Sequence, residues 1–279
     1  MRRFTLLTLS AIGCLFSLVA CSSSDGAVAT LAVCDAPGYH GTRDPTNIER
    51  VDATLLDPSG APVAHSLLQV CGIDQCFALQ TNDAGRVTIT PPAPLIRPAF
   101  KYGNGDDYAE LAAALGPTAH QDLGEITAWP LPSYADGAAF PKRGTLRNGE
   151  VTLFIEGEVT FDHLTYPDDA QLVFRTVPIP LEQSQLAVDP SLGFELMYGL
   201  APLGSTFCPA VRASLNNTLA WAPGTEVEVF IQGLEAAENW APYGEWLKVA
   251  IARVAPDGAS IDTTSGGIPI LSSIALRRK

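Results

Sequence analysis

Four cysteines beyond the N-terminal segment carry the most reactive side chains of this sequence. Cys34, Cys71, Cys76 and Cys208 make an even number, which fits disulfide formation in an oxidising compartment. Four cysteines allow three pairings, and we expect Cys71 to pair with Cys76 and Cys34 with Cys208. Two alternatives stay open. One pair can remain reduced and buried, or all four thiolates can bind zinc, although the sequence lacks the two close CxxC pairs typical of such sites.

Oxygen-bearing side chains form two candidate calcium sites. The first contains Asn104, Asp106 and Asp107, and the second contains Asp168 and Asp169. Calcium prefers carboxylate and amide oxygens as ligands. The same residues can equally cap a helix in the first case and form a turn in the second. We therefore expect no metal, with calcium as the alternative.

Acid–base chemistry is a third option. Glu156 and Glu158 share one face of a predicted strand, with Asp162 nearby, and neighbouring carboxylates can serve proton transfer. A solvated strand face explains the same pattern. The four histidines do not lie at metal-ligand spacing, and the motifs of zinc peptidases, serine hydrolases and phosphate loops are absent. We therefore expect neither catalysis nor a cofactor.

Three aromatic residues close together form the most suggestive binding motif. Trp240, Tyr243 and Trp246 lie within one short segment that contains proline and glycine. Aromatic side chains in a loop can stack on sugars or anchor a protein partner. The alternative is that they pack over a hairpin at the end of a strand. They are the candidate ligand-binding residues of this chain.

The N-terminus determines the expected location. Arg2 and Arg3 precede an apolar run too short to cross a bilayer as a stable helix, which is typical of an export signal. The run ends in Leu18–Cys21, which resembles the lipobox of bacterial lipoproteins. This resemblance implies cleavage before Cys21 and acylation of that cysteine. Ser22 follows, and by the same resemblance it favours the outer membrane over the inner membrane.

The composition limits the partners. Apolar residues make up 47% of the 279 residues and charged residues 17%, so a packed core is expected. The net charge of −13 argues against nucleic acid, because phosphate contacts need lysine and arginine. It also argues against electrostatic binding to anionic lipid heads. The membrane contact is therefore expected through acyl chains on Cys21, with an envelope protein or a polysaccharide as a further partner.

Strand patterns predict a first module over residues 47–132, after a flexible tether over residues 21–46. Apolar and polar residues alternate from Val51 to Leu55. The run Asp57–Val63, a core strand and the run Leu79–Val87 together resemble the carboxypeptidase regulatory-like (transthyretin-like) β-sandwich. The resemblance implies a spacer or binding unit. One departure is a helix, which the apolar spacing predicts between Tyr108 and Leu115.

A second β-sandwich is predicted over residues 149–279, after a linker over residues 133–148. Its clearest signal is the alternation from Val151 to Phe161, which Gly157 interrupts at a bulge or bend. Short strands and regular turns follow to the end of the chain. This part is similar to β domains of exported bacterial lipoproteins, and more distantly to the spectrin-binding β modules of ankyrins, which implies a structural or interaction role.

The sequence therefore predicts an all-β protein with two β-sandwich modules, immunoglobulin-like or transthyretin-like, and one short helix in the first. We expect an exported, lipid-anchored envelope protein that is not an enzyme and that has a structural or protein-interaction role. The alternative is a surface lipoprotein that binds carbohydrate or another ligand through the loop Trp240–Trp246.

Overall fold

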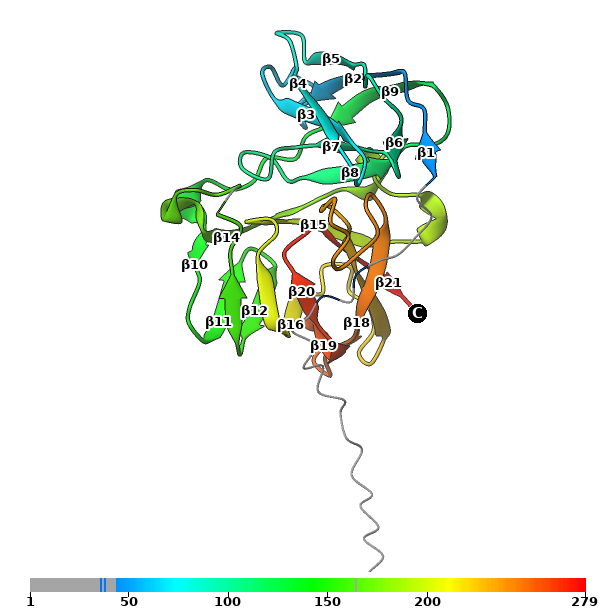
Figure 1. Cartoon of the computed structure of the whole chain (residues 1–279). Coiled ribbons are helices and arrows are strands. Elements are labelled where there is room, and N and C mark those ends of the chain that lie inside the picture. The colour runs from blue at the N-terminus through cyan, green and yellow to red at the C-terminus, as the bar shows by residue number, and fades with distance from the viewer. Residues whose placement is uncertain (1–35, 37, 39–43, 164) are drawn as a thin grey trace, which may run out of the picture. The chain divides into compact units, whose positions relative to one another are not determined.

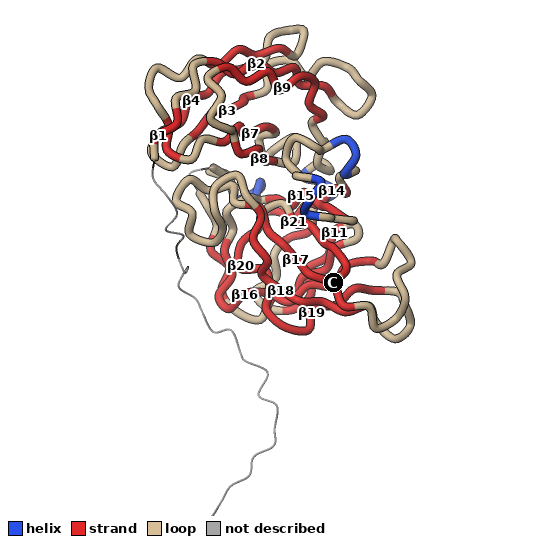
Figure 2. Tube along the Cα trace, turned by 90° about the vertical axis from the view of Figure 1, so that its right-hand side faces the viewer, coloured by secondary structure: helices blue, strands red, loops and turns tan. Residues whose placement is uncertain are grey.

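The computed structural model describes residues 36, 38, 44–163 and 165–279 (Figure 1). These residues belong to one compact unit. Nearly all of their regular structure is β-strand, as Figure 2 shows. The predicted all-β class is therefore confirmed.

Helical structure in the described ranges is limited to short 3₁₀ turns. None of the helices in these ranges has the length and apolar content needed to cross a membrane. The predicted export signal, the acylated Cys21 and the disulfide partner Cys34 lie outside the described residues. The 3₁₀ turns are η1 (Tyr134–Asp136), η2 (Asp169–Gln171), η3 (Leu181–Gln183) and η4 (Pro190–Leu192).

The first module contains two sheets that bury side chains in the same apolar cluster. One sheet has the order β5-β2-β9 and the other the order β4-β3-β7-β8, while β1 pairs with β6. Val51, Ala53 and Leu55 are buried as the alternation predicts. The strands are β1 (Pro45–Thr46), β2 (Arg50–Leu56), β3 (Leu67–Cys71), β4 (Cys76–Gln80), β5 (Arg86–Ile89), β6 (Leu95–Ile96), β7 (Ala99–Tyr102), β8 (Leu111–Ala114) and β9 (His120–Thr127).

The helix predicted between residues 108 and 115 is wrong, because β8 is a strand that pairs with β7. Asn104 Oδ1 accepts hydrogen bonds from the N–H groups of residues 106–108 and so fixes a turn in front of the strand. Residues 111–113 are all buried. The apolar run therefore reflects burial on both faces of a strand, which the spacing of apolar residues cannot distinguish from a buried helix.

The second module is built on one large sheet of 12 strands. Its main order is β10-β14-β15-β21-β17-β18-β19-β16-β12-β11, and β13 and β20 also pair with β16. The strands are β10 (Ala138–Ala139), β11 (Gly144–Asn148), β12 (Val151–Ile155), β13 (Glu158–Thr160), β14 (Val173–Pro178), β15 (Leu196–Ala201), β16 (Thr206–Asn216), β17 (Glu226–Gln232), β18 (Trp246–Val254), β19 (Ser260–Gly266), β20 (Ile268–Ile270) and β21 (Ile274–Arg278).

The break between β12 and β13 lies at the predicted bend. A Cβ atom on Gly157 would lie 1.9 Å from the carbonyl oxygen of Cys208, so only glycine allows this approach to β16. The predicted alternation also holds in β12, where Val151, Leu153 and Ile155 are buried. Gly157 therefore allows the chain to continue along β16 after a change of direction.

The segment 133–148 is not a free linker. It contains β10, which pairs with β14, and β11, which forms a hairpin with β12. The hairpin turns at Gly149, whose φ is +53°. Proline and glycine in this segment mark the turns between short strands, so the composition resembles that of a linker although the strands belong to the second sheet.

The two modules share an apolar core. Ile179, Met197 and Ala275 of the second module belong to the same buried cluster as the strands of the first module. Arg175 of β14, almost fully buried, donates hydrogen bonds from Nη1 to the carbonyl oxygens of Asp106 and Pro132. Residues of both modules can therefore line a common site.

One disulfide is described in full. Cys71 and Cys76 lie directly opposite each other in the β3–β4 hairpin and are bonded, as predicted. Cys208 is also disulfide-bonded, and its expected partner, Cys34, lies outside the described residues. Zinc bound by all four cysteines is excluded, because the sulfurs of Cys71, Cys76 and Cys208 are oxidised.

Removal of the hairpin disulfide should lower stability. We expect the variant Cys71→Ala/Cys76→Ala to unfold with a free energy about 2 kcal/mol smaller, because the unfolded chain gains the entropy of a short loop. Urea unfolding of the variant and the parent protein under oxidising conditions measures the difference. An unchanged midpoint would contradict the estimate.

Candidate ligand-binding site

A cavity of about 240 Å³ lies where β7 and the residue before β8 of the first module meet strand ends and loops of the second. We call it the Trp240 cavity. The segments after β13, β15, β17 and β20 form its wall on the side of the second module. Its polar and aromatic lining residues are Lys101, Glu110, Asp162, Thr165, Gln232, Glu235, Asn239, Trp240 and Ser272.

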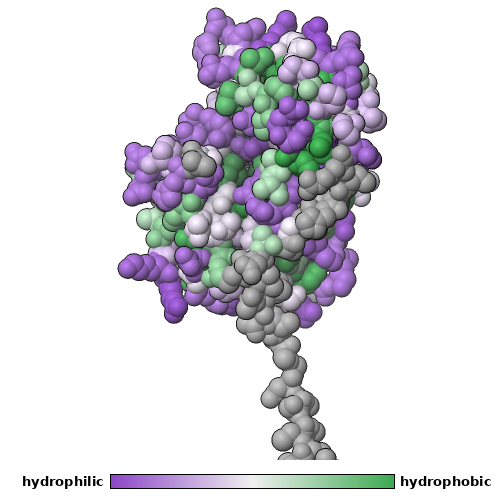
Figure 3. All heavy atoms as spheres, viewed as in Figure 1, coloured by the Kyte–Doolittle hydropathy of each residue, from purple (hydrophilic) through white to green (hydrophobic). Residues whose placement is uncertain are grey.

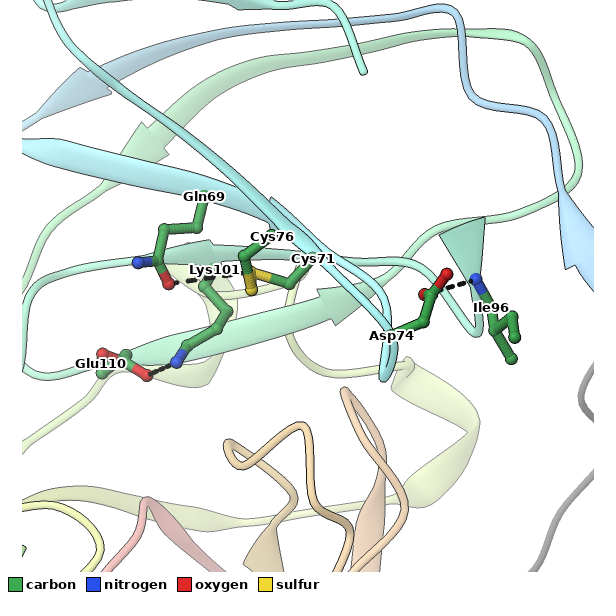
Figure 4. The surroundings of a disulfide bond; sticks show 7 residues. All are labelled: Gln69, Cys71, Asp74, Cys76, Ile96, Lys101 and Glu110. Carbon is green, nitrogen blue, oxygen red and sulfur yellow. Dashed lines mark hydrogen bonds and ion pairs between the residues drawn. A yellow bond between two sulfur atoms is a disulfide. The ribbon is translucent and has the colours of Figure 1, made fainter. Parts of the chain in front are cut away.

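The first module contributes an ion pair to this cavity. Lys101 on β7 and Glu110, just before β8, approach to 2.6 Å between Nζ and Oε1. Their side chains are only 17% and 13% exposed, so the pair is largely withdrawn from water. Figure 4 shows this pair near the Cys71–Cys76 disulfide. Because β3 pairs with β7, Gln69 lies opposite Lys101.

Two carboxylates of the second module approach the same point. A Cβ atom on Gly204 would lie 3.5 Å from Glu235 Oε1 and 3.9 Å from Asp162 Oδ2. Asp162 also accepts a hydrogen bond of 2.6 Å from the Thr165 hydroxyl. Burial, and then the neighbouring Asp162 charge, raise the pKa of Glu235, while a hydrogen bond from Asn239 and the charge of Lys101 act in the opposite direction.

The loop between β17 and β18 carries three of the polar and aromatic lining residues, namely Glu235, Asn239 and Trp240. Its two ends are held together, because the N–H of Gly233 donates to the carbonyl oxygen of Glu245 and the N–H of Gly244 donates to that of Gly233, both at 2.8 Å. A Cβ atom on Gly233 would lie 1.9 Å from the carbonyl oxygen of Pro242. Glycine is therefore required where the loop closes.

A buried ion pair fixes the middle of this loop. Arg97 Nε and Glu238 Oε1 are 2.8 Å apart, with side chains 13% and 4% exposed. Glu238 Oε1 also accepts a hydrogen bond of 2.7 Å from the N–H of Tyr243. The loop is thus attached to the first module and folded around one carboxylate.

Tyr166 connects the two modules beside the cavity. Its hydroxyl donates to the carbonyl oxygen of Gly105 and accepts from the N–H of Leu203, both at 3.0 Å. Its ring belongs to a small apolar cluster with Leu203 and Leu234, which also line the cavity. These contacts make the apolar side of the site.

The three predicted ligand-binding aromatics have different environments. Trp240 is half-buried and lines the cavity. Tyr243 is 2% exposed and packs with Cys71 of β3 and Ala99 of β7, so it holds the loop against the first module. Trp246 donates a hydrogen bond of 2.9 Å from Nε1 to the carbonyl oxygen of Ala187 and packs on the shared core. Of the three, Trp240 alone lines this cavity.

The other candidate residues have structural contacts. Asn104 fixes the turn before β8, and Asp168 caps η2 by accepting a hydrogen bond from the N–H of Ala170. Glu156 pairs with Arg212 on the surface. Groups of three or more metal-ligating side chains do not occur in the ranges that the structure describes.

Sequence patterns did not reveal most of the lining residues. Lys101, Glu110, Glu235 and Asn239 come from separate segments that only the folded chain brings together. One available signal was the group of Glu235, Glu238 and Asn239 directly before Trp240, soon after the strand that ends at Gln232. Asp162 was considered only together with Glu156 and Glu158, and the bend at Gly157 separates Glu156 from the other two.

Comparisons with known proteins do not identify a family. No protein-family model and no curated protein matches the chain, so the resemblance to the carboxypeptidase regulatory-like sandwich is not confirmed. One similar solved structure is a "putative carbohydrate binding protein" from Bacteroides uniformis, with 7% identity over 84% of this chain and 100% of that chain and a TM-score of 0.24. Another is a DUF3823 family protein from Bacteroides ovatus, with 8% identity, coverage of 78% and 96%, and a TM-score of 0.21. Scores this low establish neither a common fold nor a common function.

Proposed function

We propose that this protein binds a small carbohydrate in the Trp240 cavity and does not transform it. The observation that carries the proposal is the presence of Trp240 in one cavity with Asp162, Glu235 and Asn239. Carboxylate and amide oxygens accept hydrogen bonds from hydroxyl groups. An indole ring offers a flat apolar surface to the C–H face of a sugar ring.

The size of the cavity supports a small ligand. Its volume of about 240 Å³ lies below the range of about 300–1,000 Å³ that is common for drug-sized ligands. A single sugar unit, or the end of a longer chain, is the corresponding ligand. Polar and apolar residues both line the cavity, so hydroxyl groups and C–H groups of a sugar would each find partners there.

A protein-interaction role is the alternative. On the face shown in Figure 3, leaving the grey residues aside, apolar residues occur in small groups among hydrophilic ones. Permanent protein interfaces bury broader apolar surfaces. This face therefore favours ligand binding over a permanent complex.

Substitution of Trp240 tests the binding site. In a glycan array followed by calorimetry with the full chain in detergent, we expect Trp240→Ala to weaken binding of a bound sugar about tenfold, or about 1.4 kcal/mol. Phe140→Ala is the matched control, because Phe140 is also a partly buried aromatic residue on the same apolar cluster but does not line the cavity. Equal affinities of Trp240→Ala and the parent protein would refute the site, and an array without any hit would refute the carbohydrate proposal.

We also propose that the protein is exported and anchored to the outer membrane by acyl chains on Cys21. The support is the N-terminal sequence Leu18–Cys21, followed by Ser22. We expect Cys21→Ala to leave unprocessed precursor and to abolish labelling with radioactive palmitate. Normal labelling of this variant would refute the anchor, and fractionation of labelled membranes tests the outer-membrane location.

A further inference from the structure

We infer that β4 of the first module pairs antiparallel with β4 of a second copy of this chain, so that two copies form a weak, reversible dimer. The paired strands would join the four-stranded sheets of both copies into one continuous sheet. This surface is independent of the proposed sugar site. The inference depends on the free edge of β4, on the absence of charge along it and on the way its side chains match in one register.

β4 is an edge strand of its sheet. It ends the order β4-β3-β7-β8 at the edge opposite β8 (Figure 1). The backbone of Cys76–Gln80 forms a ladder with β3 and makes no further hydrogen bond with the described residues. Four of these five residues are exposed. Because alternate N–H and C=O groups of an antiparallel strand point away from its neighbour, β4 presents a row of them to another strand.

The absence of charge distinguishes β4 from most other edge strands. Its sequence is Cys-Phe-Ala-Leu-Gln, without a charged side chain. Charged side chains oppose edge-to-edge pairing, and they occur in β5, β9 and β11, for example at Arg86, Asp122 and Arg147. The edge of β8 is already occupied by the side chain of Gln232. β4 is therefore the long edge best suited to pairing.

The β3–β4 hairpin also exposes large apolar side chains. Leu67 and Leu79 are 43% and 49% exposed, and they are two of the four large apolar residues exposed in the described ranges. Leu79 lies opposite Leu68, which is fully buried, so Leu79 is on the core-facing side of the sheet. Phe77 is on the same side and is half-buried against the core. A further strand would cover both Phe77 and Leu79.

One antiparallel register pairs the whole of both strands. It places Ala78 opposite Ala78 of the second copy, on the two-fold axis. Two small side chains then meet on the outer face of the sheet and allow close approach. Phe77 lies opposite Leu79 of the second copy on the core-facing side, and the symmetry repeats this apolar pair. The strand is therefore complementary to itself.

The same register avoids contacts between like charges. The net charge of −13 makes copies of this chain repel each other in general. Asp74 and Asp83 are the carboxylates that flank β4 in the sequence. Continued beyond the strand, the register places Asp74 opposite Asn82 and Asp83 opposite Ile73. Carboxylates therefore do not face each other along this edge.

Sedimentation equilibrium of the full chain in density-matched detergent tests the dimer. Because five residues from each copy make a small interface, we expect a dissociation constant of about 10 μM to 1 mM. Ala78→Lys would place like charges opposite each other and should weaken dimerisation at least about tenfold. Thr145→Lys is the matched control, because Thr145 is also exposed on an edge strand, β11. It should retain the dimerisation of the parent protein.

A mixture of two charge variants tests the register. Ala78→Glu alone should dimerise as poorly as Ala78→Lys, whereas an equal mixture of the two should dimerise at least as well as the parent protein, since opposite charges then meet on the axis. Loss of the fold or contact through another surface would not be restored by mixing.

Three results would each overturn the inference. They are a parent protein that stays monomeric over this concentration range, parent-like dimerisation of Ala78→Lys, and a mixture of the charge variants that remains monomeric. Circular dichroism checks that each variant is folded. If a charge variant does not fold, Leu79→Ser removes the apolar side chain opposite Phe77 of the second copy, and parent-like dimerisation of this folded variant would also overturn the inference.

Discussion

Replacement of Glu238 by alanine is expected to lower the free energy of unfolding by about 3–5 kcal/mol, which is the usual cost of removing one member of a buried ion pair. The guanidinium of Arg97, with a side chain only 13% exposed, would lose a carboxylate 2.8 Å away. The N–H of Tyr243 would lose its acceptor in the same step. Glu238 has a φ of +50°, and alanine retains a Cβ atom there, so backbone strain changes little. The loss is therefore electrostatic.

Glu245 provides the matched control for this experiment. It pairs with the same arginine at 3.3 Å from Nη2, but its side chain is 55% exposed. An exposed pair contributes at most about 1 kcal/mol because water screens it, so Glu245→Ala should unfold within that margin of the parent protein. Urea unfolding of both variants measures the difference. Similar losses for the two would show that burial does not control the strength of this pair.

The effect of Glu238→Ala should extend to ligand binding. Glu238 holds the loop that carries Glu235, Asn239 and Trp240, although it does not line the cavity itself. Variants that remain folded should therefore bind the ligand more weakly, through altered positions of these side chains. Glu245→Ala should retain the parent affinity.

Most strands were predictable, because a strand with one buried and one solvated face shows alternating apolar and polar residues within a few positions of sequence. In β2 and β12 one face is buried and the other is solvated, so the pattern of period two is visible. β8 was not predictable, because its residues are buried on both faces and the alternation disappears. The segment 133–148 resembled a linker because its short strands are separated by proline and glycine.

The site was less predictable than the strands, since its residues come together only through tertiary packing. The sequence left open whether Trp246 contacts a ligand or packs on the protein, and its side chain faces away from the apolar cluster of its own module. The structure covers that face with the shared core of the two modules. Lys101 and Glu110 gave no signal at all, because a lysine and a glutamate nine residues apart are common on any surface.

Gln232 joins the modules at the cavity, and its replacement by leucine is expected to cost about 2–6 kcal/mol of stability. Its side chain, 1% exposed, accepts from the N–H of Ala112 at 3.1 Å and donates to the carbonyl oxygen of the same residue at 2.7 Å. It thereby completes the hydrogen bonds of β8, the edge strand of its sheet. Leucine has a similar size but would leave two buried backbone groups unsatisfied, at about 1–3 kcal/mol each.

Gln121 provides the matched control for Gln232, because its side chain makes similar hydrogen bonds to the backbone in an exposed position. Its side chain donates to the carbonyl oxygens of Gly116 and Thr118 in an exposed loop, where water can replace it, so Gln121→Leu should cost less than about 1 kcal/mol. Ala112 lies opposite Lys101 in the β7–β8 pair, and Lys101 lines the cavity. Gln232→Leu should therefore also displace Lys101 and weaken sugar binding. A folded Gln232→Leu protein with parent stability would show that the edge of β8 does not need this side chain. The joint between the modules would then depend on the shared apolar core and on the remaining polar contacts, such as those of Arg175 and Tyr166.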